Sequence, residues 1–391
     1  MLNRYYADLH IHIGRTDSGK PVKITGARSL TLKNILETAA NVKGMNMIGV
    51  IDCHVPEIIA ELERLIAEGE VFEHEEGGVW FKHICLILGS EIEVYDESCR
   101  GPIHVLAFMP KLEKMKQFSH YLAERMKNIT LSSQRIYETG ENLQRKVKEL
   151  GGLFIPAHVF TPHKSLYGKG VCSTLTEVLD PFLIDGIELG LSSDTHMAET
   201  IQELEKYTFL SNSDAHSLEK IGREYQIVQM AKPTFKELEL ALLEKDGRKV
   251  IANFGLNPKL GKYYQTTCEK CGAGFNDIST LECPFCGSRR FVKGVRDRLF
   301  ELSESGKQKR RARPPYVHQV PLEFLPSLGK KTLEKLRDHF GTDMAILHEV
   351  SETQLKQVVK PELATMILNA RAGKLLIQTG GGGVYGKIKN S

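Results

Sequence analysis

The stretch ADLHIHI, residues 7–13, decides how the rest of the sequence is interpreted. Its alternation of polar and apolar residues predicts a β-strand, and one face of that strand carries Asp8, His10 and His12. Because His10 and His12 are two residues apart, their imidazoles point to the same side and can bind one cation. Such a strand face normally packs against an apolar core, so the metal-capable side chains on it predict a metal site.

Short apolar runs and helical patterns alternate over the first 250 residues. Amphipathic spacing predicts helices over residues 30–43, 57–69 and 142–152. Repeated strand–helix alternation favours a parallel α/β architecture, and seven or eight such units indicate a barrel. The expected strands cover residues 7–13, 47–52, 84–92, 103–108, 153–159, 186–190, 208–216 and 225–230.

Metal-capable side chains gather at the carboxyl ends of these strands. In an α/β barrel this rim is where an active site assembles. One histidine at a strand end is more often a hydrogen-bonded structural residue, but histidines at five strand ends are hard to explain by packing. Asp214 and His216 also repeat the two-residue spacing of the first strand. The residues concerned are His10, His12, Asp52, His54, Glu91, His104, His158, Glu188, Asp214 and His216.

The composition indicates a chain with a sizeable core and more than one domain, because its 391 residues are 41% hydrophobic and 26% charged. No run approaches the roughly 18 consecutive apolar residues of a membrane span. The beginning, MLNRYYADLH, lacks the apolar region of a secretory signal. We therefore expect no membrane association and a cytoplasmic location.

Charge divides the chain into two parts. Residues 1–250 hold 29 Lys and Arg against 36 Asp and Glu, a net charge of −7. Residues 251–391 hold 23 against 13, a net charge of +10. The basic part suggests an anionic partner such as nucleic acid, whereas the acidic part either holds metal cations or only has a solvated surface.

Four of the eight cysteines form two CxxC pairs separated by 11 residues. This spacing is typical of a zinc ribbon, in which each pair supplies two thiolates from a tight turn. Disulfides are rare in the cytosol, so we expect one structural Zn²⁺ here. Such a ribbon either takes part in function or only stabilises a small module. The four ligands would be Cys268, Cys271, Cys283 and Cys286.

A basic segment follows the cysteines. Such runs are usually solvated linkers, but one joined to a nucleic-acid-binding module contacts phosphates. The candidate DNA contacts in this segment are Arg289, Arg290, Arg296, Arg298, Arg310, Arg311 and Arg313.

The stretch LPSLGKKTLEKLRDHFGT, residues 325–342, supplies such a module because it resembles a helix-hairpin-helix element. Gly329 would lie in the hairpin, whose amides and the following helix terminus face a phosphate, while Lys330 and Lys331 add positive charge. Residues 360–374 are a candidate second helical unit. The ending GGGGVYGKIKNS resembles the glycine-rich tails that accompany such elements in some repair proteins, and the simpler alternative is a disordered tail.

The motifs DLHIH, IDCH, GSEIE, IHVLAF, AHV and SDAH, in that order, resemble the PHP (polymerase and histidinol phosphatase) metal-dependent phosphoesterases. The resemblance implies a distorted, TIM-like (β/α)7 barrel with two or three divalent metals. It assigns Glu91, Asp214 and His158 to catalysis. It places the first metal on His10, His12, Glu91 and Asp214, the second on Glu91, His104 and His158, and a third on His54 and His216.

The sequence departs from this pattern at one point. Three-metal members have a further histidine soon after the first motif, but none occurs between His12 and His54. Asp17 is the candidate substitute. Asp8 and Asp52 are interpreted as acceptors that orient imidazole N–H groups.

The ligand set predicts hydrolysis of a phosphate ester. Imidazoles with a bridging carboxylate favour Zn²⁺, with Mn²⁺, Fe²⁺ or Mg²⁺ as alternatives. Two or three such cations activate a water and stabilise both the attacking and the leaving oxygen of an in-line displacement at phosphorus.

The order of the parts is similar to the endonuclease Q family of DNA repair nucleases. That resemblance implies hydrolysis 5′ to deaminated bases (uracil, hypoxanthine, xanthine) and abasic sites, with the lesion nucleotide flipped into a pocket. The expected parts are a barrel at 1–250, a zinc module at 251–300, a basic linker at 301–324, an all-α DNA-binding domain at 325–378 and a tail at 379–391. We expect a monomer that binds damaged DNA and hands its product to other repair proteins.

Two alternatives remain open from the sequence. One is a PHP-type exonuclease or small-molecule phosphatase, and the other is a non-catalytic DNA-binding scaffold. Segments too long for tight turns, and so candidates for lesion contacts, are 14–30, 72–81 and 160–173. The last of these carries Lys164 and Lys169, which either contact DNA or lie on a solvated loop.

Overall fold

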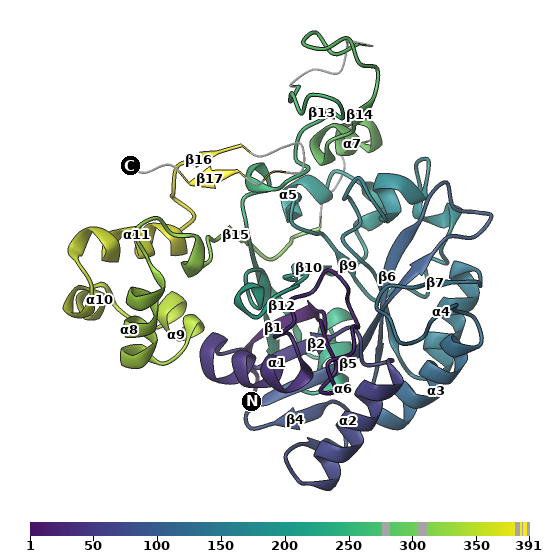
Figure 1. The fold of residues 1–391 in the computed structure, drawn as a ribbon, viewed down its shortest axis with the longest axis horizontal. Helices are drawn as coiled ribbons and strands as arrows, with labels where there is room; N and C mark the ends of the chain where they lie inside the picture. The colour runs from purple at the N-terminus through teal and green to yellow at the C-terminus, as the bar shows by residue number, and fades with distance from the viewer. Residues whose placement is uncertain (276–281, 304–310, 380–383, 385, 389–391) are drawn as a thin grey trace.

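The computed structural model describes residues 1–275, 282–303, 311–379, 384 and 386–388 (Figure 1). The predicted DNA contact Arg310 and most of the glycine-rich tail lie outside these residues. No helix in the described ranges is both long and apolar enough to cross a membrane.

Seven strands form the frame of the amino-terminal part. Strands β1, β2 and β5 pair in parallel, while β6 runs antiparallel to both β5 and β8. The short strands β9 and β10 form a separate parallel pair. Their bounds are β1 (Asn3–Ile11), β2 (Met47–Val50), β5 (Ile84–Val94), β6 (Ile103–Met109), β8 (Leu153–Pro156), β9 (Ile187–Glu188) and β10 (Phe209–Leu210).

The expected uniformly parallel alternation is therefore wrong at β6. Only residues 95–102 connect β5 to β6, and a parallel crossover needs a dozen or more residues. The chain reverses direction instead, without an intervening helix. This reversal makes the barrel irregular.

Backbone hydrogen bonds bring the separate strand pair into the ring. The amide of Val159, after β8, donates to the carbonyl of Glu188 in β9 at 3.0 Å. On the other side, the amide of Ala215 donates to the carbonyl of His10 in β1 at 3.1 Å. The interior of the ring is filled by fully buried side chains that include Leu9, Ile87, Leu106, Ile155 and Leu210. The seven strands thus enclose an apolar core, with the strand ends meeting at one rim.

Helices cover the outside of this frame, as Figure 1 shows for α2, α3 and α4. The apolar stripe of α2 is typical, because Ile58, Leu62 and Leu65 are buried while its other face is largely solvated. The three helices expected from the sequence correspond to α1 with its π-helical extension, α2 and α4. The bounds are α1 (Leu32–Thr38), the extension (Ala39–Lys43), α2 (Pro56–Ala67), α3 (Leu112–Ala123), α4 (Gly140–Glu149), α5 (Thr195–Ala198) and α6 (Phe235–Leu242).

The sheet continues beyond β1 into later parts of the chain. Strand β11 (Tyr225–Met230) pairs antiparallel with β1, and β12 (Lys249–Gly255) pairs antiparallel with β11. Strand β15 (Tyr316–His318) then adds in parallel to β12. The boundary expected at residue 250 falls inside β12, and the expected basic linker contributes β15. We therefore propose that the first structural unit ends after β12 and includes β15.

Short strands at the edges are β3 (Phe72–Glu73), β4 (Val79–Phe81) and β7 (Arg135–Ile136).

The carboxyl-terminal part consists of two further units. Hairpin strands carry the cysteine module at the top of Figure 1, and four helices form a cluster at its left. A two-stranded ribbon follows the helices, so residues 377–378, expected to be helical, are a strand. The bounds are β13 (Thr267–Cys268), β14 (Phe291–Val292), α7 (Val295–Leu302), α8 (Lys330–Phe340), α9 (Asp343–His348), α10 (Glu352–Val358), α11 (Pro361–Arg371), β16 (Ile377–Gln378) and β17 (Lys387–Ile388).

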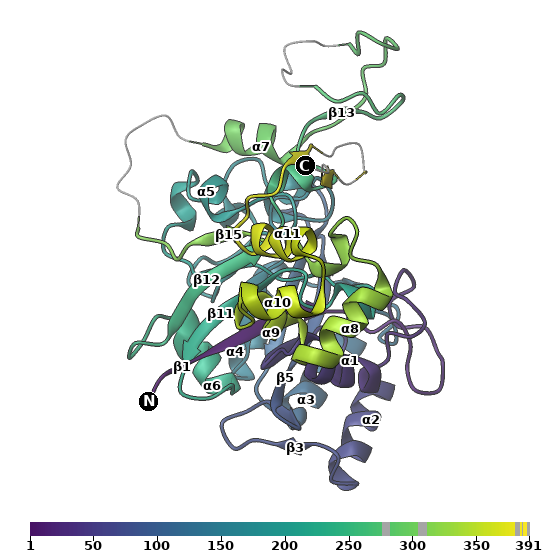
Figure 2. The same ribbon diagram turned by 90° about the vertical axis from the view of Figure 1, so that its left-hand side faces the viewer.

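The helical cluster packs against the barrel beside α1, as the turned view in Figure 2 shows. At this junction, Lys43 is only 3% exposed and forms ion pairs with Glu323 and, at 3.1 Å, with Asp343. Its ammonium also donates to the carbonyl of Glu219 at 2.8 Å. Arg337 pairs with the same two carboxylates. Cations and carboxylates of the barrel and of the carboxyl-terminal part therefore form a largely buried network of ion pairs at this junction.

Replacement of Lys43 by Met should destabilise the protein by about 3 kcal/mol, because it leaves buried carboxylates with one cation fewer. The matched control is Lys33→Met, since Lys33 is 55% exposed and pairs with Glu70 at the surface. That change should stay within about 0.5 kcal/mol. Urea unfolding of both variants measures the difference, and equal stabilities would contradict the role of Lys43.

Candidate metal centre

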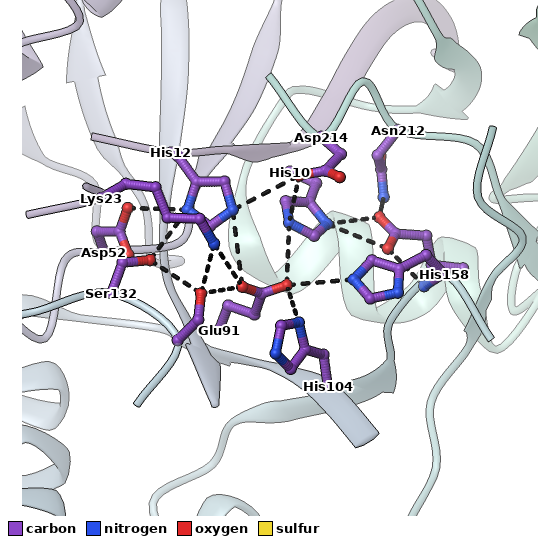
Figure 3. Close-up of polar contacts among 12 residues, drawn as sticks. His10, His12, Lys23, Asp52, Glu91, His104, Ser132, His158, Asn212 and Asp214 are labelled. Carbon is purple, nitrogen blue, oxygen red and sulfur yellow. Dashed lines mark hydrogen bonds and ion pairs between the residues drawn. The ribbon is translucent and has the colours of Figure 1, made fainter. Parts of the chain in front are cut away.

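The carboxylate of Glu91 lies at the centre of a buried cluster of imidazoles (Figure 3). Glu91 is in β5 and is 1% exposed. Its Oε1 lies 2.9 Å from Nδ1 of His104, 3.3 Å from Nε2 of His158 and 3.6 Å from Nε2 of His10. Its Oε2 lies 3.6 Å from Nε2 of His12. Burial alone would raise the pKa of Glu91, but His104 and Lys23 hold it well below its usual range. The group is therefore an anion surrounded by nitrogen donors.

One donor group consists of His10, His12 and Asp214. The Nε2 atoms of both histidines lie 3.5 Å from Oδ1 of Asp214. These separations are long for hydrogen bonds, but they match the edge of a tetrahedron with metal–ligand bonds of 2.0–2.1 Å, which is about 3.4 Å. Both Nε2 atoms are buried without a hydrogen-bond partner. The residues present therefore fit a divalent cation.

The second donor group consists of Glu91, His104 and His158, again with ligand atoms within 4.8 Å of one another. Because Glu91 also lies beside His10 and His12, the two groups adjoin at its carboxylate. Nε2 of His104 is buried and unpaired, 3.7 Å from Glu93. Two cations held in this way would share one carboxylate, the arrangement that suits in-line displacement at phosphorus.

Carboxylates behind the imidazoles fix their orientation. Nδ1 of His10 lies 2.9 Å from Oε1 of Glu188, and Nδ1 of His12 lies 3.1 Å from Oδ2 of Asp52. Because a carboxylate only accepts, each Nδ1 carries the hydrogen and each Nε2 is left to bind a metal. Glu188 is itself held by Nδ2 of Asn212 at 2.7 Å and by the amide of His158 at 2.8 Å.

Asp8 does not orient an imidazole, contrary to the expectation from the sequence. Its carboxylate accepts from the backbone amides of Ser213, Gly222 and His10, at 3.0, 2.9 and 3.4 Å. It therefore fixes the turn that carries Asp214. The role predicted for Asp8, accepting a hydrogen bond from an imidazole, is taken by Glu188. Glu188 comes from β9, 178 residues away from His10, so sequence proximity could not identify the pair.

The expected third metal group is not assembled in the part of the chain that the structure describes. The Asp17 side chain is 70% exposed and forms an ion pair with Arg64 at 3.5 Å, and it belongs to neither donor group. His54 is fully buried with both ring nitrogens unpaired. Nδ1 of His216 lies 3.0 Å from the carbonyl oxygen of Asp214, and burial lowers the pKa of this imidazole to about 4. Asp17 therefore does not replace the missing histidine.

Strained backbone positions the ligands that follow β8 and β10. His158 and Asp214 have φ values of 31° and 46°, in the left-handed region that residues with a Cβ rarely adopt. Gly190 allows the turn at His158, because a Cβ at residue 190 would lie 2.8 Å from that of His158. Such strain is typical of functional sites.

The four cysteines converge as expected from their spacing. Sγ of Cys268 lies 3.5 Å from that of Cys286, and Sγ of Cys271 lies 3.5 Å from that of Cys283. All four sulfur atoms lie within 4.8 Å of one another. Zn–S bonds of about 2.3 Å place tetrahedral ligands about 3.8 Å apart, so the cluster fits a zinc ion.

Several arginines predicted to contact DNA instead bind the protein itself. Arg298 donates to the carbonyls of residues 167, 171 and 172, at 2.7, 3.1 and 2.7 Å. Arg313 donates to the carbonyls of residues 204, 205 and 207 and lies over the ring of Phe209. Arg311 binds two carbonyls and Glu244, and Arg296 binds Asp297 and a carbonyl. The donors of Arg298 and Arg313 fix the segments 167–172 and 204–207, and the DNA role of these two arginines stays a prediction.

Other predicted DNA contacts remain at the surface. Arg289 and Arg290 are 78% and 77% exposed and lie near Glu282 and Glu269. Lys164 pairs with Glu93 at the rim, and Lys169 lies in the π-helical turn Leu166–Gly170. Gly329 caps the amino terminus of α8, and the exposed residues 330 and 331 form its first turn.

Two of the three long segments reach the rim. Segment 14–30 contributes Lys23 and Thr25, and segment 160–173 contributes Thr161. Segment 72–81 does not, because β4 pairs with the amino-terminal half of β5, at the opposite end from Glu91. The prediction that it contacts a lesion therefore gains no support from its position in the fold.

A cavity of about 350 Å³ adjoins the cluster on the side of Asp214. Sequence reasoning did not identify its basic and aromatic residues, because no motif marks them. They come from the turn after β10 and from the chain that follows β12, which meet only in the fold. They are Lys220, Arg223, Lys262 and Tyr263.

Replacement of Glu188 by Gln should weaken divalent-metal binding 10- to 100-fold, because Nδ1 of His10 loses its anionic acceptor. The control is Glu70→Gln, since Glu70 pairs with Lys33 at the surface, and this change should leave metal affinity within a few-fold. Mn²⁺ titration followed by electron paramagnetic resonance compares the two without contribution from the thiolate site, which favours softer ions. An equal loss in both variants would contradict the assignment.

Metal affinity should rise with pH. Burial alone would lower the pKa of His10, but Glu188, Asp214 and Glu91 together raise it to about 10 in the metal-free protein. The proton on His10 therefore stabilises the metal-free fold fully below about pH 6.5, and this contribution is lost as the pH rises through about 10. A metal must displace that proton, so Mn²⁺ affinity should increase by up to tenfold per pH unit between pH 7 and 8.5. A flat profile would exclude a protonated His10.

Comparison with known proteins agrees with this geometry. No family model matches the chain. The uncharacterized protein YqxK of Bacillus subtilis is 59% identical over 388 residues, which are 99% of this chain and 100% of that protein. The uncharacterized protein MJ0043 of Methanocaldococcus jannaschii is 37% identical over 252 residues, but these cover 59% of this chain and 31% of that protein.

Two solved structures match nearly the whole chain. The lesion-specific endonuclease PfuEndoQ from Pyrococcus furiosus is 30% identical with a TM-score of 0.84, covering 99% of this chain and 95% of that one. Endonuclease Q in complex with a 27-mer duplex substrate with an abasic lesion at the active site matches with the same TM-score and identity, covering 100% and 97%. Full-length similarity at this level, together with the two donor groups at Glu91, confirms the resemblance seen in the sequence: the chain belongs to the endonuclease Q family.

Proposed function

We propose that this protein is a metal-dependent DNA endonuclease that hydrolyses the phosphodiester 5′ to deaminated bases and abasic sites. The observation that carries the proposal is the pair of donor groups that adjoin at Glu91 in a chain of the endonuclease Q family. The related enzyme bound to an abasic duplex supports DNA as the substrate.

The barrel residues would hold two divalent cations. His10, His12 and Asp214 would hold one, and Glu91, His104 and His158 the other, with Zn²⁺ favoured by the imidazoles and Mn²⁺, Fe²⁺ or Mg²⁺ as alternatives. When bound, such cations supply an activated water and neutralise charge on the phosphate oxygens. Asp52 and Glu188 accept from Nδ1 of His12 and His10 and so keep both imidazoles oriented with Nε2 toward the metal site. A further Zn²⁺ on the four cysteines would stabilise their module.

The cavity beside Asp214 is the proposed pocket for the lesion nucleotide. Its volume of about 350 Å³ is in the range of small-molecule sites, and it is lined by both a metal-site residue and basic groups. Lys220 and Lys262 provide positive charge for a phosphate, and Tyr263 offers an aromatic face to a base. Flipping costs a few kcal/mol and least for damaged or missing bases, so this step contributes to selectivity.

Surface groups on two units would bind the flanking DNA. Arg289 and Arg290 are exposed on the cysteine module. On the helical cluster, the amino terminus of α8 combines backbone N–H groups with the side chains of Lys330 and Lys331. A helix amino terminus with lysines is suited to a phosphate.

We propose that the protein acts as a cytoplasmic monomer.

The decisive assay uses duplexes that each carry one uracil, hypoxanthine, xanthine or abasic site. The metal-loaded protein should cut on the 5′ side of the lesion, as mapped on a sequencing gel, and leave an undamaged duplex intact. Release of mononucleotides or inorganic phosphate would instead indicate an exonuclease or a phosphatase. Absence of any lesion-dependent product would overturn the proposal.

Replacement of Asp214 by Asn should lower cleavage of the abasic duplex at least about 100-fold, because the first donor group loses an anionic ligand. DNA affinity measured by fluorescence anisotropy should be largely retained, since the proposed contacts to the flanking DNA come from the cysteine module and α8. The matched control is Asp246→Asn, an exposed aspartate in a turn with φ of 51°. A non-catalytic scaffold would show no cleavage by either variant or by the unmodified protein.

A further inference from the structure

Lys23 reaches into the metal centre from segment 14–30. Its ammonium donates to Oε2 of Glu91 at 3.2 Å and to Oγ of Ser133 at 2.7 Å, and the side chain is only 16% exposed (Figure 3). The hydroxyl of Ser133 in turn donates to the same carboxylate oxygen. A surface lysine exposes its ammonium to solvent, whereas this largely buried one lies on the carboxylate at which the two donor groups adjoin.

The backbone of this lysine is fixed from both sides. Its amide donates at 2.8 Å to the carbonyl of Ile13, which is next to His12 and two residues beyond the end of β1. The preceding residue, Val22, accepts from the amide of Ser132 at 3.0 Å. The ammonium is therefore held at a defined position relative to the imidazoles rather than attached to a free loop.

The position of the ammonium is distinct from those of the two donor groups. It lies on Oε2 of Glu91, whereas His104 and His158 lie on Oε1. The negative charges of Asp52 and Asp214 also act on it, and its charge acts on His216. Of the residues expected to bind a third cation, His216 is acted on by this ammonium and Asp17 instead pairs with Arg64 at the surface.

We propose that Lys23 provides the third positive charge of the centre, so that the barrel holds two metal ions and one ammonium. An ammonium has three N–H donors, of which Glu91 and Ser133 accept two. The third is directed to a non-bridging oxygen of the scissile phosphate. This contact rests on the proposed phosphodiesterase function, whereas the number of metal ions does not.

The number of metal ions is tested by elemental analysis of the protein loaded with Zn²⁺ and desalted. The expected content is about three zinc ions per chain, two in the barrel and one on the cysteines. A content of about four would overturn the proposal, because a third barrel ion would then be present beside Lys23.

The phosphate contact is tested by titrating the zinc-loaded protein with inorganic phosphate in a calorimeter. Lys23→Met keeps the length of the side chain but removes its charge, and it should weaken phosphate binding at least tenfold with zinc content unchanged. Lys23→Arg should restore part of the affinity. The matched control is Lys20→Met, since Lys20 lies in the same segment but is 73% exposed and pairs with Glu57. Phosphate affinity in Lys23→Met equal to that of the Lys20 control would overturn the contact.

Cleavage of the abasic duplex separates this proposal from the proposed function. Lys23→Met should lower kcat about 100-fold if the ammonium stabilises charge developing on the phosphate. If the unmodified protein binds phosphate through Lys23 but cuts no damaged DNA, the endonuclease proposal fails and the role of Lys23 stands. If it cuts and Lys23→Met cuts equally well, the role of Lys23 fails alone.

Discussion

The burial of one carboxylate, that of Glu91, is the constraint on which the rest of the structure depends. An anion that is 1% exposed is costly unless cations or donors surround it, and here four imidazoles and one ammonium do so. These groups come from β1, β6, the turn after β8 and segment 14–30, so the frame must bring several strand ends to one rim. The reversal of β6 serves this purpose, because it places His104 opposite Glu93 across an antiparallel pair, with its Nδ1 2.9 Å from Oε1 of Glu91.

The sequence could predict the groups whose geometry is local. Alternation along β1 placed His10 and His12 on one face, and the strand–helix pattern placed the other ligands at strand ends, which a barrel brings together. It could not predict partners chosen by long-range packing. Glu188 orients His10 from 178 residues away, and Asp8, although adjacent in sequence, binds backbone amides instead. Lys23 lies in no motif, and only the fold places its ammonium on Glu91.

The basic carboxyl-terminal part shows why net charge overestimates a DNA-binding surface. A guanidinium has five donors in a planar arrangement, which suits clusters of backbone carbonyls as well as phosphates. Arg298 and Arg313 each satisfy three carbonyls of irregular segments that have no ladder partners. They join the later parts of the chain to the barrel. Among the described residues, the basic groups exposed to an external partner include Arg289 and Arg290 on the cysteine module and Lys330 and Lys331 at α8.

The ligands also carry a conformational cost that the fold must offset. His158 and Asp214 occupy the left-handed region, at roughly 1–3 kcal/mol each, and several imidazole nitrogens are buried without a hydrogen-bond partner. Several of these features coincide at the two donor groups, which contain His158 and Asp214 as well as the unpaired Nε2 atoms of His10, His12 and His104. Cations bound at the two donor groups would coordinate the unpaired nitrogens. Because they bind the folded state alone, their binding free energy would stabilise that state and offset the strain of the turns. The features that destabilise the metal-free protein at this cluster thus favour metal binding. The stability of the barrel and the chemistry proposed for it therefore depend on the same residues.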